Sequence, residues 1–188
     1  MPPTLTKDRR LLGRNSVWNV YYDHVVDQDG NEVRDYLVLE GAGRSSNNVT
    51  GVCVLPVMNG RFVLLRCYRH ALKSDLWEAP RGFIESGECV RRAAVRELAE
   101  ETNLICAASN LVDLGFYAPE ASTLAARGAL FAATGCEGTL RAGTDEIGVG
   151  AAGLFDQKEM AELVATGAIE DAGTLIAYYR FCSSAGDL

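Results

Sequence analysis

The sequence predicts an α/β sandwich in which a mixed β-sheet lies between helices, with a small antiparallel β element ahead of it. Strand-like and helical segments interleave along the chain, but without the regular strand–helix–strand repeat of a Rossmann sheet. The length of 188 residues suits one domain, or one domain with a small appendage. No internal repeat or low-complexity tract is visible.

The chain begins with a predicted β-hairpin. Residues 18–26 and 33–39 are rich in Val, Tyr and Trp, as strands are. The segment 27–31 between them carries Asp, Gly and Asn, which are typical of a turn. Residues 1–16 are polar and basic, and we expect them to be a loosely held lead-in.

A stretch rich in Gly, Ser and Asn at 41–48 separates this hairpin from the main body. We therefore expect an N-terminal β element at 1–45 and a main domain at 46–188. The main domain opens with a second hairpin, whose strands 51–58 and 61–68 flank an Asn-Gly turn. Both strands are almost continuously apolar, so we expect them to be buried on both faces.

Segment 88–102 is the clearest helix, because charged and apolar residues mix at helical spacing and no Gly or Pro interrupts them. The remaining elements are shorter and follow from similar patterns. We expect strands at 111–117, 128–133 and 147–154, and helices at 157–166 and 171–181.

Composition excludes several functional classes. The net charge of −7 argues against a nonspecific nucleic-acid surface. No apolar run approaches the roughly 20 residues that a membrane span needs, and the N-terminus has no signal-peptide core. The six cysteines are scattered without a Cys-x-x-Cys pair, so neither a zinc site nor a disulfide framework is expected. We therefore expect a cytoplasmic protein.

The candidate chemistry is concentrated in the predicted helix. Glu97 and Glu101 are four residues apart and share one face, and Glu100 borders it. Like charges at this spacing destabilise a helix by about 0.2–0.5 kcal/mol per pair. Arg96 can compensate part of this charge and hard divalent cations the rest. Mg²⁺ prefers carboxylate oxygens and is completed by substrate phosphates, so the segment is a candidate phosphate–metal platform.

The spacing of these residues is more specific than a solvated, glutamate-rich helix requires. The pattern Gly-x5-Glu-x7-Arg-Glu-U-x-Glu-Glu-x-Gly-U, with U apolar, is matched at Gly82, Glu88, Arg96, Glu97, Leu98, Glu100, Glu101 and Leu104. A chance match has a probability on the order of 10⁻⁸ per window. The segment resembles the Nudix box, with Asn103 where that family usually has Gly. Asn is the next-best residue for the left-handed conformation that ends the helix there.

The resemblance implies a Nudix-type fold and a Mg²⁺-dependent hydrolase of nucleoside diphosphate compounds, in which Mn²⁺ can substitute for Mg²⁺. Glu97 and Glu101 are then the principal metal ligands. Glu100 assists them, and Arg96 holds the glutamates in place by ion pairing. Glu88 ties the loop to the start of the helix.

Segments on both sides of the box resemble the ADP-ribose pyrophosphatase branch of that family. The Tyr-Arg pair at 68–69 and the Trp-Glu-Ala-Pro run at 77–80 precede the box much as related motifs do there. Pro119 and the tail 145–176 resemble its downstream proline and its strand–helix–helix ending. The first hairpin resembles a dimerisation element, often exchanged between subunits, so a homodimer is expected.

This branch implies hydrolysis of ADP-ribose to AMP and ribose 5-phosphate. Arg69, Glu78, Arg81 and Gly82 are the residues expected at the substrate. The family uses the backbone carbonyl at position 81 on a metal, so Arg81 also counts as a metal ligand. Its guanidinium replaces a more usual alanine and is suited to phosphate contact, which can alter substrate choice.

Two residues compete for the role of catalytic base. Glu146 matches the loop that supplies the base in this branch, although a surface acid beside glycines has the same appearance. Glu120 is the rival, because it follows Pro119 where the family usually has Gly.

Two other functions stay open. The same chemistry on another nucleotide sugar or a dinucleotide is compatible with the box, which holds metal and diphosphate rather than base or sugar. A nucleotide-binding sensor would use the scaffold without turnover, but no box glutamate is lost. A nucleic-acid partner is not expected, given the acidic balance.

Overall fold

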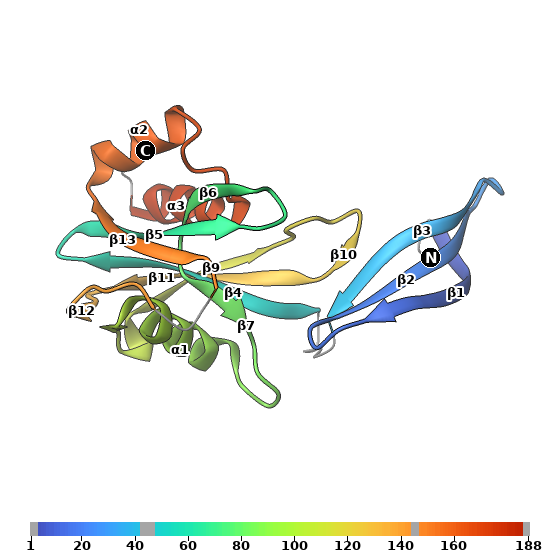
Figure 1. The fold of residues 1–188 in the computed structure, drawn as a ribbon, viewed down its shortest axis with the longest axis horizontal. Coiled ribbons are helices and arrows are strands. Elements are labelled where there is room, and N and C mark those ends of the chain that lie inside the picture. Colours follow the sequence, from blue (N-terminus) through green and yellow to red (C-terminus); the bar gives the residue numbers. More distant parts are fainter. Residues whose placement is uncertain (1–3, 42–47, 144–146, 186–188) are drawn as a thin grey trace. The chain divides into compact units, whose positions relative to one another are not determined.

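A computed structural model describes residues 4–41, 48–143 and 147–185, and contacts within it divide the chain into two compact units (Figure 1). The first unit takes residues 1–50 together with 118–127. The second unit takes residues 51–117 and 128–188. None of the described helices is long and apolar enough to cross a membrane.

The first unit is a four-stranded sheet in the order β1-β2-β3-β10. β1 and β2 are antiparallel, as are β2 and β3, whereas β10 runs parallel to β3. Asp27 shapes the turn between β2 and β3, since its Oδ1 accepts the N–H groups of Asp29 and Asn31 at 2.9 Å each. The predicted hairpin and its turn are therefore confirmed. The strands are β1 (Thr4–Arg14), β2 (Trp18–Asp27), β3 (Glu32–Gly41) and β10 (Leu124–Ala125).

The expectation of a loosely held lead-in at residues 1–16 is wrong, because β1 pairs with β2 along most of its length. The sequence of β1 shows no alternation of apolar and polar residues, and nearly all of its side chains are exposed. It is held by backbone pairing and by Arg9, whose Nε and Nη2 donate to the two carboxylate oxygens of Asp23 at 2.7 Å each. Asp23 lies on β2 and is buried.

The second unit is a seven-stranded mixed sheet between helices, as predicted. Its main path runs β13-β5-β4-β11-β9, with β6 paired to β5 and β7 to β4. α1 lies on one side of this sheet, and α2 and α3 lie on the other (Figure 1). The strands are β4 (Val49–Met58), β5 (Arg61–Arg69), β6 (Ser74–Glu78), β7 (Arg81–Phe83), β9 (Leu111–Tyr117), β11 (Arg127–Thr134) and β13 (Val149–Phe155). The helices are α1 (Val90–Thr102), α2 (Gln157–Ala165) and α3 (Ala172–Ala185).

Strand β4 is buried on both faces, as its apolar run predicts. Cys53 and Leu55 join a core cluster with Met160 of α2 and Ala177 of α3. Val54 lies between them in sequence and is equally buried, but successive strand residues point to opposite faces. The sheet therefore forms a hydrophobic core on each side.

Helix α1 is shorter at its start than the predicted 88–102, because Cys89 is its N-cap in an extended conformation. It ends at Asn103, which has φ 57° and ψ 21° and donates its N–H to the carbonyl of Ala99 at 2.9 Å. Ala94 and Leu98 are fully buried on the face toward the sheet. Asn103, which replaces the Gly usual in the family, thus also ends the helix in a left-handed conformation.

The other predicted strands and helices are present within a few residues of their expected bounds, but several short elements were not predicted. β6 precedes the box, β7 contains its first residue, Gly82, and the small sheet of β8 with β12 follows α1. Elements this short carry no measurable periodicity. The remaining short elements are β8 (Leu104–Ile105), the 3-10 helix η1 (Ala108–Asn110) and β12 (Glu137–Gly138).

Candidate active site

The acidic face of α1 is the centre of the candidate site. Glu97 and Glu101 lie one turn apart, and each is only 8% exposed. Glu100 points further outward, with 59% of its side chain exposed. Two nearly buried carboxylates on one face require charged or hydrogen-bonding partners.

Arg96 is the main partner of these glutamates. Its Nη1 donates to Glu97 Oε1 at 2.8 Å and to Glu100 Oε2 at 3.0 Å. Its Nε and Nη2 donate to the two oxygens of Glu88 at 3.1 and 2.9 Å. The hydrogen bonds that Arg96 donates to Glu88 and Glu97 raise the pKa of Arg96 despite its partial burial, so the guanidinium stays charged. A fixed cation therefore holds three carboxylates in one arrangement.

The loop before α1 is fastened to the same cluster. Glu88 Oε2 also accepts the N–H of Glu85 at 3.1 Å, and Arg96 Nη2 donates to the carbonyl of Phe83 at 2.9 Å. The hydrogen bond from Arg96 lowers the pKa of Glu88. The loop and the helix start are thus joined through one carboxylate.

Gly82 leaves room for Glu97. An added Cβ at position 82 would lie 2.1 Å from both Cδ and Oε1 of Glu97. No side chain fits there unless the carboxylate moves, so the glycine allows close approach of the backbone to this glutamate.

The segment before Gly82 lies along the other edge of the acidic face. The N–H of Arg81 donates to Glu101 Oε2 at 3.0 Å. One residue earlier, the carbonyl of Pro80 accepts the N–H of Val54 on β4 at 2.9 Å. The hydrogen bond to strand β4 therefore fixes the position of this segment, and Glu101 accepts a hydrogen bond directly from the segment.

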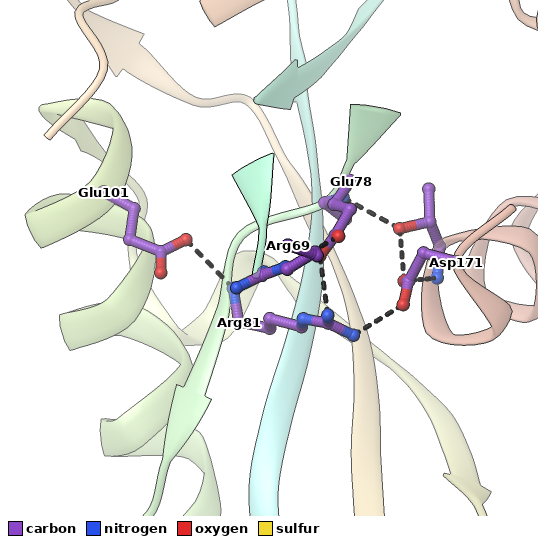
Figure 2. Close-up of polar contacts among 7 residues, drawn as sticks. Arg69, Glu78, Arg81, Glu101 and Asp171 are labelled. Carbon is purple, nitrogen blue, oxygen red and sulfur yellow. Dashed lines mark hydrogen bonds and ion pairs between the residues drawn. The ribbon is translucent and has the colours of Figure 1, made fainter. Parts of the chain in front are cut away.

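A network of four charged side chains continues from this segment (Figure 2). Arg69 on β5 donates to both oxygens of Glu78, at 2.8 and 2.6 Å. Arg81 reaches the same carboxylate with Nη2 at 2.7 Å and reaches Asp171 with Nη1 at 2.5 Å. Only 1% of the Glu78 side chain is exposed. Burial lowers the pKa of Arg81, but the carboxylates of Asp171 and Glu78 outweigh it, and the net pKa is raised.

The start of α3 completes the network. Asp171 Oδ2 accepts the N–H and the hydroxyl of Thr174 at 2.8 and 2.7 Å. The Thr174 hydroxyl oxygen in turn accepts the N–H of Ala79 at 2.8 Å. Sequence reasoning missed these two residues as site candidates. Their Asp-x-x-Thr spacing signals a helix cap, but nothing local connects it to a segment some ninety residues earlier.

Cys53 and Tyr117 lie near the network and stay protonated. Burial raises the pKa of the Cys53 thiol, and the nearby carboxylate of Asp171 adds to that effect. Burial likewise raises the pKa of the Tyr117 hydroxyl. Neither is an activated nucleophile.

The donor set fits a magnesium ion. Mg²⁺ is usually bound by one or two carboxylates, several waters and substrate phosphates. Glu97 and Glu101 offer hard carboxylate oxygens, and the absence of a Cβ at Gly82 leaves the backbone close to Glu97. Among the described residues, no group of three or more His, Cys, Asp or Glu side chains is placed to hold a metal by itself.

The two candidate bases are placed differently. Glu120 belongs to the first unit, where its carboxylate accepts the N–H of Ser122 at 3.0 Å and the Ser122 hydroxyl at 2.5 Å. The hydroxyl hydrogen bond lowers the pKa of Glu120. Glu146 lies outside the residues that the structure describes. The choice between them stays a prediction.

Comparisons with known proteins bear on the family and the fold of the chain. A family model described as the NUDIX domain matches residues 47–172. No curated protein matches the chain. Among solved structures, one titled as the crystal structure of an ADP compounds hydrolase matches with a TM-score of 0.79. It is 17% identical, and the match covers 100% of this chain and 98% of that one, which shows a shared fold.

Proposed function

Because the chain belongs to the Nudix hydrolase family, we propose that it is a Mg²⁺-dependent pyrophosphohydrolase whose preferred substrate is ADP-ribose. Water attacks one phosphorus of the diphosphate, the bridging P–O bond breaks, and AMP and ribose 5-phosphate leave. A nucleotide-type small molecule as substrate is what the family implies.

The observation that carries this proposal is the pair of nearly buried glutamates on α1. Arg96 bonds Glu97 at 2.8 Å, and the Arg81 N–H bonds Glu101 at 3.0 Å, so both carboxylates are held before any ligand arrives. When bound, Mg²⁺, or Mn²⁺ in its place, polarises the diphosphate and lowers the pKa of a water. The chain's own contribution is to hold the carboxylates in place, which lowers the reorganisation needed in the transition state.

Other residues take supporting roles in the proposal. Glu100 and Arg96 complete the charged cluster around the metal. The backbone at Arg81 would help to hold the metal, and Arg69, Glu78, Arg81 and Gly82 would take part in binding the substrate. Glu146 or Glu120 takes the proton from the attacking water.

ADP-ribose is the favoured substrate because the motifs before and after the box resemble that branch of the family. The similarity in fold to a protein titled an ADP compounds hydrolase agrees with an adenosine diphosphate derivative. Another nucleotide sugar or a dinucleotide uses the same residues, and a sensor without turnover is the second alternative.

We also propose a homodimer formed through the N-terminal sheet. Its strands expose apolar side chains, among them Leu5 and Leu11 of β1 and Val33 and Leu37 of β3. Such side chains are typical of an interface when they gather on one element. A cytoplasmic location fits the six free cysteines.

The test is a substrate panel with Mg²⁺, coupled to a phosphatase that acts on the released monophosphates. ADP-ribose, UDP- and GDP-sugars, NADH and diadenosine polyphosphates are compared, and products are identified by chromatography in parallel reactions without the phosphatase. We expect the highest kcat/KM with ADP-ribose and equal amounts of AMP and ribose 5-phosphate. Preference for another compound would overturn the substrate. Absence of turnover with every compound, in protein shown to be folded, would favour the sensor.

A further inference from the structure

We propose that Asp171 is a positioning residue of the active site, acting through Arg81 to fix the backbone that bonds Glu101. The catalytic consequence rests on the proposed function, whereas the contact itself does not. Asp171 is distant in sequence from the box, and none of the hydrogen bonds described for its side chain is to a box glutamate.

The start of α3 holds the segment before the box at two points. Asp171 Oδ1 accepts Arg81 Nη1 at 2.5 Å, and the Thr174 hydroxyl oxygen accepts the N–H of Ala79 at 2.8 Å. Asp171 also orients that hydroxyl, which donates to its Oδ2 at 2.7 Å. One carboxylate therefore governs both contacts between α3 and residues 79–81.

The same short segment is bonded to the acidic helix on its other side. The N–H of Arg81 donates to Glu101 Oε2, and the Arg81 side chain extends the opposite way, toward Asp171 (Figure 2). Arg81 is thus held between two carboxylates, one by its backbone and one by its side chain. Strand β4 also holds this backbone, and the proposal is that losing the side-chain contact displaces the N–H whose hydrogen bond Glu101 accepts.

Charge balance explains why Asp171 is needed. Arg69 and Arg81 both contact Glu78, whose side chain is almost fully buried. Asp171 supplies the second negative charge, and its own side chain is only 9% exposed. Without it, Arg81 would keep only Glu78 among the carboxylates described for it, would share that carboxylate with Arg69, and would lose its hold on α3. The Arg81 guanidinium therefore forms, with Asp171, a clamp between α3 and the segment before the box, whereas the Arg81 backbone bonds Glu101.

The discriminating variant is Asp171→Asn. Asn caps a helix about as well as Asp, so the start of α3 is preserved while the charge opposite Arg81 is lost. Arg81→Ala removes the other half of the pair. Asp156→Asn is the matched control, because Asp156 caps α2 in the same way, with Glu159 N–H donating to its Oδ1 at 2.8 Å, and has no contact with the network among those described.

The first readout needs neither metal nor turnover. Amide hydrogen exchange of Arg81, followed by NMR in the metal-free protein, reports the bond to Glu101. We expect exchange at least about tenfold faster in Asp171→Asn and Arg81→Ala, with no change in Asp156→Asn. Unchanged protection of Arg81 in a folded Asp171→Asn protein would overturn the proposal.

The second readout separates positioning from substrate contact. A positional error of about 1 Å can cost about 100-fold in rate, so we expect kcat to fall at least tenfold while KM stays within twofold. Mn²⁺ affinity, measured from the electron paramagnetic resonance signal of free Mn²⁺, should fall with kcat. The double variant should lose no more than Arg81→Ala alone, because that variant already breaks the pair with Asp171. A raised KM with unchanged kcat would instead mean that the Arg81 side chain binds the substrate directly.

Failure of the proposed function would be recognised separately. If the wild-type protein turned over no compound of the panel, faster exchange of Arg81 in Asp171→Asn would still support the clamp. Unchanged exchange together with normal wild-type turnover would reject the clamp and leave the hydrolase intact.

Discussion

Replacing Gly82 with alanine should destroy turnover without unfolding the protein. The new Cβ would lie 2.1 Å from Glu97 Cδ, whereas ordinary contact begins at 3.4 Å, so the carboxylate must retreat by at least 3.4 − 2.1 = 1.3 Å. A displacement of about 1 Å at a reacting centre can cost about 100-fold in rate. We therefore expect kcat to fall by about 100-fold and the Mg²⁺ concentration for half-maximal rate to rise.

The stability of this variant should fall only modestly. The colliding group is the end of a flexible side chain, and Gly82 does not have a left-handed backbone conformation. Alanine restricts the unfolded chain, which stabilises by about 0.4–1 kcal/mol. Weakening the hydrogen bonds of the nearly buried Glu97 carboxylate costs about 1–3 kcal/mol. The free energy of unfolding should therefore fall by at most about 2–3 kcal/mol, which leaves the protein folded.

The assay compares kcat, the Mg²⁺ dependence and urea unfolding of three proteins: wild type, Gly82→Ala and Gly13→Ala. Gly13 is the control, because an added Cβ there meets nothing within 4 Å. We expect the control to behave as wild type in all three measurements. Turnover of Gly82→Ala within about fivefold of wild type, with unchanged Mg²⁺ dependence, would refute the claim that the Glu97 carboxylate must stay beside a bare backbone.

Three further variants test the scaffold. Glu88→Gln should lower the free energy of unfolding at neutral pH, as measured by urea titration. The hydrogen bond from Arg96 lowers the pKa of Glu88 below its ordinary 4.5, so the difference in stability from wild type should shrink as the pH falls below 4.5 and through this lowered pKa. Arg9→Ala leaves the buried carboxylate of Asp23 without its guanidinium and should cost about 1–3 kcal/mol in the same assay; an unchanged midpoint would show that backbone pairing alone holds β1. Asn103→Ala should be less stable than Asn103→Gly by about 1 kcal/mol, since position 103 has φ 57°; equal melting temperatures would contradict a strained left-handed end.

The parts of the fold that follow a local rule were predictable from the sequence. Asp27 and its neighbours form the turn of the first hairpin because a short acidic side chain can bond the backbone two and four residues on. Helical spacing put Glu97 and Glu101 on one face, and both are found there, nearly buried.

Other features depend on contacts between distant segments. β1 carries no hydrophobic alternation, because its side chains are exposed and its order comes from pairing with β2 and from Arg9. The ion pair of Arg81 with Asp171 could not be predicted either, because only the packing of α3 brings Asp171 near. Glu78, the other partner of Arg81, is close to it in sequence. A guanidinium suited to phosphate contact on chemical grounds is therefore engaged with two carboxylates of its own chain.

The most direct test of the hydrolase is the Glu101→Gln variant, assayed for Mg²⁺-dependent release of AMP from ADP-ribose. Gln keeps the size of the side chain and an oxygen that can accept the Arg81 N–H, but it removes the charge that a metal requires. We predict a loss of about 100-fold or more in kcat with an unchanged unfolding midpoint. Near-normal turnover in the folded variant would contradict the assignment of this carboxylate to the metal, and with it the proposed active site.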